Sequence, residues 1–441
     1  MNRREFLKTA GLSAAAAGVF GTLNGCKGNE DNSPEGMTYR THRKFQDEVS
    51  LLGYGCMRWP LTKDEEGKDI VDQEMVNTLV DHALEHGVNY FDAAPVYHNG
   101  DCERITGNAL IRHRRDRYFI ATKLSNFKDA SREASMEMYR QSFRDLRTEY
   151  IDYYLLHSLG SVEDFNRRYL ENGMMDFLVE ERKAGIIRHL GFSFHGRKKD
   201  FDQLLALHEK YRWDFVQIQM NYVDWTHASS RGTDAKYMME ALEEKGIPAI
   251  IMEPLLGGSL AKPPVHIADR LKERDPKQSI ASWAFRFAGT PENVLCVLSG
   301  MTYMEHLQDN INSFSPLKPL SDSDMAFLDE TAELMKKYPT IHCTRCRYCM
   351  PCPYGIDIPA IFTHYNKCVN EGYIAQSGSE DYRKARRAYL VSYDRQVGKF
   401  NQADRCIGCN KCIPLCPQGI SIPFELRKID KYIEGLKRNK F

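Results

Sequence analysis

The sequence predicts an α/β fold: an eight-stranded parallel (β/α)8 barrel, or TIM barrel, followed by a small, mainly α-helical domain. Three observations predict it. From residue 48 onward, short β-rich apolar runs alternate with longer amphipathic segments, which is the pattern of β/α units. Eight such units span about 270 residues, close to the usual size of such a barrel. After them come two dense cysteine runs in a region rich in helix-forming residues.

The expected strands share apolar cores rich in β-branched and aromatic residues. They are VSLLGYGCM (49–57), VNYFDAA (88–94), YFIATKL (118–124), IDYYLLHS (151–158), RHLGFSFH (188–195), FVQIQMNY (215–222), PAIIMEP (248–254) and VLCVLSGM (294–301). Amphipathic helices are expected between them, for example over Gln73–His86 and Ser131–Leu146. Gly87, Gly185 and Gly246 each precede a strand, as a glycine that ends a helix should.

A doubly wound sheet is the main alternative for this alternating pattern. It would need a glycine-rich phosphate turn after the first strand, and GYGCMRW lacks the G-x-G-x-x-G spacing. GFSFHGR has the glycine spacing of a Walker A loop. However, Arg197 stands where that loop needs lysine, and Lys198 where it needs serine or threonine. The barrel is therefore the preferred fold.

The composition indicates a globular chain of several domains. Its 441 residues suit two or three domains of roughly 100–200 residues each. Sixty basic and sixty acidic side chains cancel, so no nucleic-acid partner is expected. We expect a signal segment at 1–26, a linker at 27–44, the barrel at 45–320 and the cysteine-bearing domain at 321–441.

The N-terminus has the pattern of a targeting segment. NRREFLK resembles a twin-arginine export signal, and a modest apolar stretch follows it. LNGC, which ends at Cys26, resembles a lipoprotein cleavage box; a plain cleaved signal or an uncleaved anchor are the alternatives. We therefore expect export to the periplasm or cell envelope, with a lipid anchor if Cys26 is modified. The twin-arginine route moves proteins already folded around their cofactors.

Polar side chains gather where the strands of the predicted barrel end, which is the functional face of this fold. Among them are Asp92, Tyr97, Lys123 and His157. Reduction of a carbonyl requires a proton for the developing alkoxide, and Tyr97 can donate it. Lys123 can lower the pKa of that phenol, and Asp92 can balance Lys123. His157 can orient the carbonyl oxygen. Each side chain alone could be structural, but their convergence favours a catalytic site.

At these residues the chain resembles the aldo-keto reductase family over roughly residues 45–318. NYFDAAPVY carries that family's Asp-x4-Tyr, while IATKL and YYLLHS match its lysine and histidine segments. NGDCERITGNAL resembles the stretch that follows the tyrosine. The resemblance implies that Asp92, Tyr97, Lys123 and His157 are the catalytic tetrad, and that the cofactor is NADPH or NADH.

The same resemblance implies a set of nicotinamide contacts. Phe194 replaces an asparagine of the family pattern, and Met252 replaces a stacking tyrosine. Gly300 and His306 stand where basic residues grip a 2′-phosphate, so a strong NADP preference is not expected. The implied contacts to the carboxamide, the pyrophosphate and the adenine region are, in that order, Ser193 and Gln217; Leu255, Gly257 and Gly258; Asp309 and Asn310.

Two runs hold eight of the thirteen cysteines: C-x2-C-x2-C-x2-C-P and C-x2-C-x2-C-x3-C-P. The second has the bacterial ferredoxin spacing and indicates [4Fe–4S] clusters, whereas zinc usually takes two separated C-x2-C pairs. Two clusters are therefore predicted, with zinc as the alternative. In two-cluster ferredoxins the fourth cysteine of each run ligates the other cluster. The predicted ligand sets are Cys343, Cys346, Cys349 and Cys416, and Cys406, Cys409, Cys412 and Cys352.

The region between the runs is expected to be helical, above all DYRKARRAYL. It resembles the helical ferredoxin-like modules that are fused to a subset of aldo-keto reductases. Its basic cluster is read as a solvated face, and alternatively as a docking surface for an acidic redox partner protein. That cluster consists of Arg383, Lys384, Arg386 and Arg387.

Together these features predict an exported oxidoreductase of aldo-keto reductase type. It would reduce a small-molecule carbonyl, or oxidise an alcohol, with NAD(P)H, while two clusters relay electrons or stabilise the fold. One alternative is an electron-transfer iron-sulfur protein whose barrel binds a partner. Another is a barrel that uses different chemistry on an unidentified cofactor. Since free NAD(P)H is not expected outside the cytoplasm, an exported reductase would carry it tightly bound or be recharged through the clusters.

Overall fold

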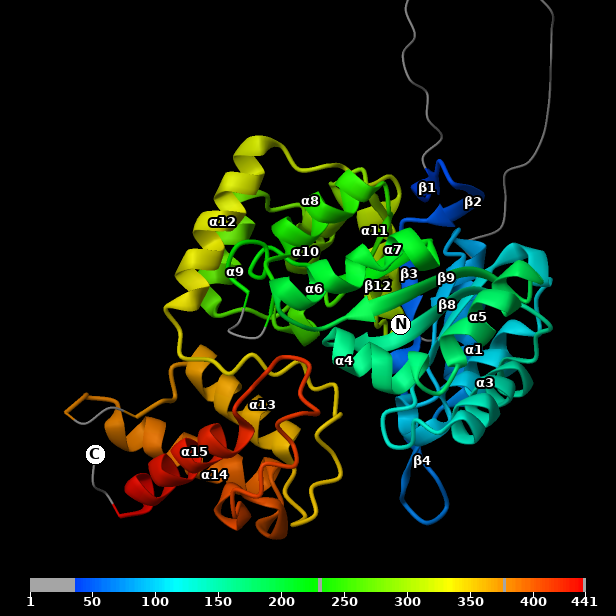
Figure 1. Cartoon of the computed structure of the whole chain (residues 1–441). Coiled ribbons are helices and arrows are strands. Elements are labelled where there is room, and N and C mark those ends of the chain that lie inside the picture. The colour runs from blue at the N-terminus through cyan, green and yellow to red at the C-terminus, as the bar shows by residue number, and fades with distance from the viewer. Residues whose placement is uncertain (1–35, 229–231, 376–377, 439–441) are drawn as a thin grey trace, which may run out of the picture. The chain divides into compact units, whose positions relative to one another are not determined.

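Eight parallel strands close into a barrel in the computed structural model, which describes residues 36–228, 232–375 and 378–438 (Figure 1). Each strand pairs with the next one along the barrel in chain order, and the last closes on the first. The predicted fold class is therefore confirmed. The strands are β3 (Leu52–Gly55), β6 (Tyr90–Asp92), β7 (Phe119–Leu124), β8 (Ile151–Leu159), β9 (Ile187–Phe194), β10 (Phe215–Gln219), β11 (Ala249–Met252) and β12 (Val294–Ser299).

The helices begin and end at residues that favour those positions. Asp72 accepts a hydrogen bond from Met75 N at the start of the first helix, and Ser131 caps the third in the same way. Gly246 ends a helix with φ 61°, in the left-handed region that glycine adopts without strain. The helices up to β12 are α1 (Gln73–Glu85), α2 (Cys102–Leu110), α3 (Arg132–Leu146), α4 (Val162–Phe165), α5 (Met174–Lys183), α6 (Lys198–Ala206), α7 (His208–Tyr211), α8 (Ala235–Lys245), α9 (Val265–Arg274) and α10 (Ile280–Gly289).

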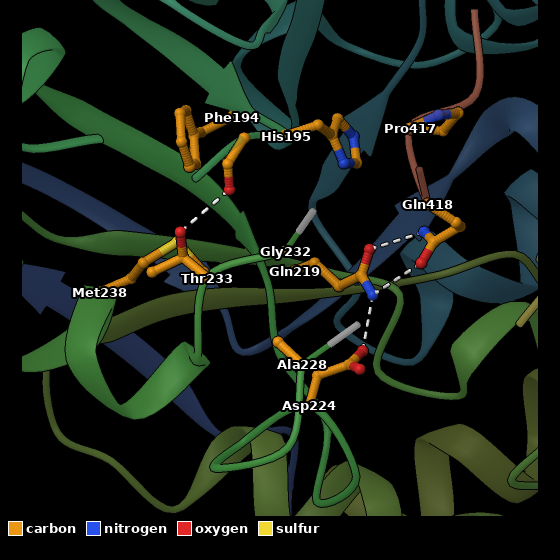
Figure 2. Close-up of a pocket in the computed structure, with 11 residues that line it drawn as sticks. Phe194, His195, Gln219, Asp224, Ala228, Gly232, Thr233, Met238, Pro417 and Gln418 are labelled. Atoms are coloured by element: carbon orange, nitrogen blue, oxygen red, sulfur yellow. Dashed lines mark hydrogen bonds between the residues drawn. The ribbon is translucent and has the colours of Figure 1, made fainter. Parts of the chain in front are cut away.

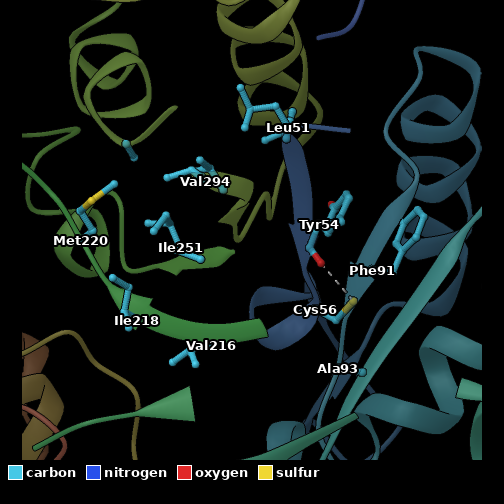
Figure 3. Packing of buried hydrophobic residues seen from close by; sticks show 14 of the residues in the cluster. Leu51, Tyr54, Cys56, Phe91, Ala93, Val216, Ile218, Met220, Ile251 and Val294 are labelled. Atoms are coloured by element: carbon cyan, nitrogen blue, oxygen red, sulfur yellow. Dashed lines mark hydrogen bonds between the residues drawn. The ribbon is translucent and has the colours of Figure 1, made fainter. Parts of the chain in front are cut away.

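The barrel strands are buried on both faces. Side chains such as Tyr153, Phe215 and Ile250 fill the interior. Leu51 and Ile251 belong to the larger cluster of buried apolar residues, part of which Figure 3 shows. Each fully buried side chain of this size contributes about 1.5–3 kcal/mol of transfer free energy. This double burial explains why the strands are nearly continuous apolar runs in the sequence.

Two hairpins escaped the sequence prediction. β1 (Tyr39–His42) pairs with β2 (Phe45–Ser50), so a strand lies inside the segment 27–44 that is expected to be a linker. The expected first strand, 49–57, is too long, because its start belongs to β2 and its end forms a 3₁₀ turn at Cys56–Arg58. β4 (Leu61–Lys63) and β5 (Asp69–Val71) form a second hairpin. Its strands are three residues long and largely exposed, so they carry no apolar pattern.

The C-terminal region is helical and has an apolar core of its own. Its helices are α13 (Ile358–Asn370), α14 (Tyr382–Gln396) and α15 (Ile422–Lys437), and Phe362, Tyr389 and Ile429 are buried among them. α14 contains the predicted helix DYRKARRAYL. α11 (Met304–Phe314) and α12 (Asp322–Lys336) precede this region. α12 begins after residue 320, yet its Leu328 and Ala332 belong to the barrel core.

The predicted export signal, including Cys26, lies outside the described residues. Across residues 36–228, 232–375 and 378–438, no helix combines the length and the apolar character that a membrane span requires.

Candidate functional site

Four of the predicted side chains meet at the C-terminal mouth of the barrel. Asp92 ends β6, Lys123 lies near the end of β7, and His157 lies near the end of β8. Lys123 Nζ is 2.5 Å from Asp92 Oδ1 and 5.2 Å from the centre of the Tyr97 ring. The rings of Tyr97 and His157 meet edge to face with their centres 5.9 Å apart. The structure thus brings together all four residues of the implied tetrad.

Lys123 and Asp92 form a buried ion pair, with 1% and 4% of their surfaces exposed. Lys123 Nζ also donates to the carbonyl oxygen of Ala93 at 2.8 Å. Burial raises the pKa of Asp92, and the adjacent ammonium of Lys123 opposes that shift. Such a pair remains charged only because each partner compensates the other.

Tyr97 is held as a neutral phenol. Burial raises its pKa well above the usual range, and Tyr348 and Asp92 raise it further. The expected lowering of this pKa by Lys123 is therefore not seen. The physical reason is that Asp92 neutralises the ammonium and that the site excludes water. A protonated phenol is the form that can donate to a developing alkoxide.

His157 is held as a neutral ring. Burial lowers its pKa well below the usual value, and the charges of Lys123 and Arg168 lower it further. Its Nδ1 lies 2.5 Å from the hydroxyl oxygen of Ser125. When Ser125 donates to Nδ1, the single N–H of the ring stands on Nε2 and points into the mouth. Sequence reasoning missed Ser125, although it follows Lys123 by two positions.

Tyr348, which lies between two cysteines of the first run, reaches into the mouth. Its hydroxyl oxygen is 3.1 Å from Nε2 of His157. Tyr348 also lies close enough to Tyr97 to raise the pKa of that phenol further. The ring of Phe127 lies beside it, with the ring centres 6.1 Å apart. Sequence reasoning gave Tyr348 no role, because nothing local marks a contact across 191 positions.

The residues expected around a nicotinamide divide into two groups. Ser193 and Gln217 lie buried at the ends of β9 and β10. The hydroxyl oxygen of Ser193 accepts from the backbone N–H of Ser158 at 2.7 Å. The amide oxygen of Gln217 is buried and has no hydrogen-bond partner among the described residues. A buried acceptor that has no donor in the protein can accept a hydrogen bond from the amino group of a carboxamide ligand.

The loop expected to hold a pyrophosphate contains Leu255, Gly257 and Gly258. Both glycines have positive φ, 65° and 94°, which suits a tight turn. Thr344 packs so closely on this turn that a Cβ at Gly257 would lie 2.5 Å from its Cα. Arg345 Nη2 donates to the carbonyl oxygen of Gly257 at 2.5 Å. The first cysteine run therefore covers the loop.

The residues expected to lie near the adenine form hydrogen bonds within the protein. Asn310 is buried and donates to the hydroxyl of Ser299 at 2.9 Å, while its neighbour Asp309 accepts from Ser313 through its backbone carbonyl. The side chain of Arg58 fills the space beside Gly300, where a Cβ would lie 2.4 Å from its Cγ.

The eight cysteines of the two runs gather into two groups. Cys343, Cys346 and Cys349 are electrostatic neighbours of Cys416, which comes from the second run. In the other group Cys412 neighbours Cys406, Cys409 and Cys352, the last from the first run. The fourth cysteine of each run thus lies with the other run, the arrangement in which a two-cluster ferredoxin crosses its ligands.

Among the described residues, the only three ligand atoms that all lie within 4.8 Å of one another belong to His82 and Glu85 of α1 and to His86, which follows it. The thiols of the two runs form no trio this close.

The comparisons agree with this geometry in both parts of the chain. The profile of the Aldo/keto reductase family matches residues 51–333, and that of the 4Fe-4S dicluster domain matches residues 342–421.

This chain belongs to the aldo/keto reductase family.

Two relatives of modest similarity are named as an oxidoreductase and a reductase. The uncharacterized oxidoreductase YqkF of Bacillus subtilis (strain 168) is 25% identical over 296 residues, which cover 60% of this chain and 87% of that protein. The NADH-specific methylglyoxal reductase of Escherichia coli (strain K12) is 22% identical over 333 residues, covering 66% and 97%. These similarities support the assignment of this chain as an oxidoreductase.

Solved structures share the barrel fold. The aldo-keto reductase AKR11C1 from Bacillus halodurans (holo form) superposes with a TM-score of 0.54 at 21% identity, over 67% of this chain and 96% of that one. An aldo-keto reductase from Klebsiella pneumoniae in complex with NADPH gives 0.53 at 20% identity, over 67% and 95%. At this level of identity the likeness is one of fold.

In this aldo/keto reductase, the second cysteine run also contacts the barrel, at a small pocket beside the mouth (Figure 2). Gln219 and Gln418 exchange side-chain hydrogen bonds of 3.3 and 2.8 Å, and Gln219 also donates to Asp224 at 2.6 Å. Gln418 follows Cys416 by two residues. The first cysteine run and the residue that follows the second run thereby both contact the C-terminal end of the barrel.

Proposed function

We propose that this chain reduces the carbonyl group of a small molecule, or oxidises the corresponding alcohol, at Tyr97. One observation carries the proposal: the oxygen of Tyr348 lies 3.1 Å from Nε2 of His157 and close to Tyr97. A substrate carbonyl oxygen at that point would be within reach of both side chains and could accept a hydrogen bond from each. The chain's own phenol thus supports an oxygen-binding site at the mouth.

In the proposed reaction each residue has a distinct role. Tyr97 donates its proton to the developing alkoxide, and the Lys123–Asp92 pair beside it offers an ammonium to the phenolate that forms. Neutral His157 donates through Nε2 and orients the carbonyl. A donor that meets the charge of a transition state in this way contributes about 2.7–4 kcal/mol.

A nicotinamide, NADH or NADPH, would supply the hydride. Gln217 and Ser193 would hold its carboxamide, and the unpartnered amide oxygen of Gln217 supports that fit. The turn at Gly257 and Gly258 could meet a pyrophosphate only with Thr344 moved off it. Asp309 and Asn310 are proposed to border the adenine.

We further propose that the eight cysteines hold two [4Fe–4S] clusters with crossed ligands. The dicluster profile and the two thiol groups support this arrangement. The clusters would relay electrons, to or from a redox partner protein, or stabilise the fold. Export by the twin-arginine route to the periplasm or cell envelope, with a lipid on Cys26, remains part of the proposal because a folded cluster protein suits that route.

A second candidate function is electron transfer by the clusters, with the barrel acting only as a binding surface. The covered mouth favours it, since Tyr348 and Thr344 stand where substrate and cofactor would lie.

Exchange of Tyr97 for phenylalanine separates the two candidates. We expect Tyr97→Phe to lose at least about a hundredfold of the NADH-dependent turnover of methylglyoxal, used as a probe because a relative reduces it. Tyr303→Phe, at an exposed tyrosine, is the matched control and should keep the wild-type rate. Full turnover by Tyr97→Phe would reject catalysis at the tetrad and favour the electron-transfer function.

A further inference from the structure

We propose that Tyr348 is an internal occupant of the substrate-oxygen site and determines which molecules enter it. The segment from Cys343 to Tyr348 would leave the mouth before substrate and dinucleotide bind. This inference rests on the proposed function, because it takes Tyr97 and His157 as the residues that bind the substrate oxygen.

The first support is the position of the phenol oxygen. It lies 3.1 Å from His157 Nε2 and beside Tyr97, so it occupies the place that a carbonyl oxygen between these two side chains requires. An oxygen of the chain and an oxygen of the substrate cannot occupy one point. The centre of the Tyr348 ring lies 6.1 Å from the ring centres of both Phe127 and His157, and the rings of Phe127 and His157 are 5.1 Å apart. The phenol is therefore packed in the mouth as well as hydrogen-bonded there.

The second support is that the same short segment covers the cofactor loop. Thr344 lies on Gly257, and Arg345 donates to the Gly257 carbonyl at 2.5 Å. Arg58 of the barrel donates to the carbonyl oxygen of Thr344 at 2.7 Å, which is a further hydrogen bond between the barrel and the segment. Five consecutive residues thus close both the oxygen site and the pyrophosphate turn.

The backbone just before Tyr348 adopts an unusual conformation. Arg345 and Arg347 both adopt positive φ, 58° and 66°, which is unfavourable for residues with a side chain. These two left-handed residues let Tyr348 face the barrel while Cys346 and Cys349 remain with their thiol partners. Strained conformations of this kind persist where the surroundings impose them.

The contacts that hold the segment are ones that a ligand can replace. They are single hydrogen bonds and two aromatic contacts, and within the described part of the chain no ion pair joins this segment to the barrel mouth. A dinucleotide and a carbonyl would form equivalent bonds in their place. If only a small fraction of molecules is open, the measured dissociation constant for a ligand equals that of the open form divided by this fraction. The closed segment therefore weakens the measured affinity.

Chemical labelling of His157 tests this occupancy without any turnover. Full-length wild type, Tyr348→Ala and Tyr348→Phe are treated with diethyl pyrocarbonate, and the acylated histidines are identified by mass spectrometry. Exposed His86 serves as the internal reference, and Tyr354→Ala, at an exposed tyrosine two residues after Cys352, is the matched control. The same variants are titrated with NADH and NADPH by fluorescence.

We expect His157 to be protected in wild type and in Tyr354→Ala, and to react at least tenfold faster in Tyr348→Ala. The dissociation constant for NADH should fall at least about fivefold in Tyr348→Ala and in Tyr348→Phe, which keeps the ring but loses the hydrogen bond to His157. Because Tyr348→Phe preserves the packing, it provides the test if the alanine variant does not fold.

Equal labelling of His157 in wild type and Tyr348→Ala, with unchanged NADH affinity, would overturn the inference. So would a Tyr348→Phe variant that binds NADH as wild type does but no longer turns over, because Tyr348 would then be a catalytic group. If Tyr97→Phe retains full turnover while the labelling behaves as expected, the proposed reaction fails and the occupancy of the mouth by Tyr348 stands.

Discussion

At the scale of single residues, the site is decided by burial more than by nearby charges. Tyr97 stays protonated and His157 stays neutral because both are removed from water, and the charge of Lys123 is matched by Asp92. The sequence could place these four residues together, since each follows a strand of a recognisable barrel. It could not place Tyr348, because the contact depends on how a distant segment folds back.

The Lys123–Asp92 pair gives a stability prediction. Lys123→Met should lower the free energy of unfolding by about 3–5 kcal/mol, because it leaves a buried carboxylate without its partner. The double variant Lys123→Met/Asp92→Asn should recover a large part of this loss, as no buried charge remains. Urea unfolding of the wild type, both single variants and the double variant measures the coupling. Additive losses would contradict a coupled pair.

Ser125 gives a prediction about the tautomer of His157. Ser125→Ala should lower kcat for methylglyoxal about tenfold or more while leaving KM nearly unchanged, because the ring loses the partner that keeps the N–H on Nε2. Ser125→Thr retains the hydroxyl and should preserve most of the rate. A Ser125→Ala variant with wild-type kcat would show that the tautomer is set by other contacts.

At the scale of elements, the spacing of apolar residues and the positions of glycines were sufficient to predict the strands and helices of the barrel. All eight strands were found because each is buried on both faces and is bounded by a turn. The hairpin of β4 and β5 was missed because exposed strands of three residues have no such pattern. The capped helices α1 and α3 were found with their ends within one residue.

Glu103 connects three elements and gives a pH prediction. It lies buried on α2, where it accepts from Thr122 of β7 and, at 3.1 Å, from Ser142 of α3. Burial raises its pKa to about 7, against an ordinary value of 4.5. The folded chain therefore holds this proton more tightly than the unfolded chain does. Its contribution to stability is present below pH 4.5 and is lost as the pH rises through about 7.

Replacement by glutamine should remove that dependence. Glu103→Gln keeps hydrogen-bonding capacity but has no proton to lose. Between pH 5 and pH 8 the free energy of unfolding of wild type should therefore fall by about 2–3 kcal/mol more than that of Glu103→Gln. Glu85→Gln, at an exposed glutamate of α1, is the control and should follow the wild-type curve. Parallel curves for wild type and Glu103→Gln would show that Glu103 does not carry this proton.

At the scale of the whole molecule, the catalytic barrel and the cysteine-bearing region share one site. Thr344 and Tyr348 lie in the first cysteine run and Gln418 directly follows the second, and all three contact residues at the ends of barrel strands or the loops after them. The sequence predicted both parts from local spacing. It did not predict their contact, because no local pattern records which surfaces of two folded parts meet.

Iron content tests the proposed clusters. Protein purified without oxygen should contain about eight iron and eight sulfide ions per chain, as two [4Fe–4S] clusters require. Cys352→Ala should lose about half of both, because Cys352 lies with the group of Cys406, Cys409 and Cys412. Cys368→Ala, at a buried cysteine outside the two runs, should keep the full content. Zinc in place of iron would contradict the cluster assignment.

The central claim is that a substrate oxygen binds between Tyr97 and His157, in the place that Tyr348 holds. The most direct measurement is the single-turnover rate of NADH oxidation by methylglyoxal, without oxygen, for wild type, Tyr97→Phe and Tyr348→Phe. We predict that Tyr97→Phe is slower by at least about a hundredfold and that Tyr348→Phe is as fast as wild type or faster. Equal rates for wild type and Tyr97→Phe would contradict the claim.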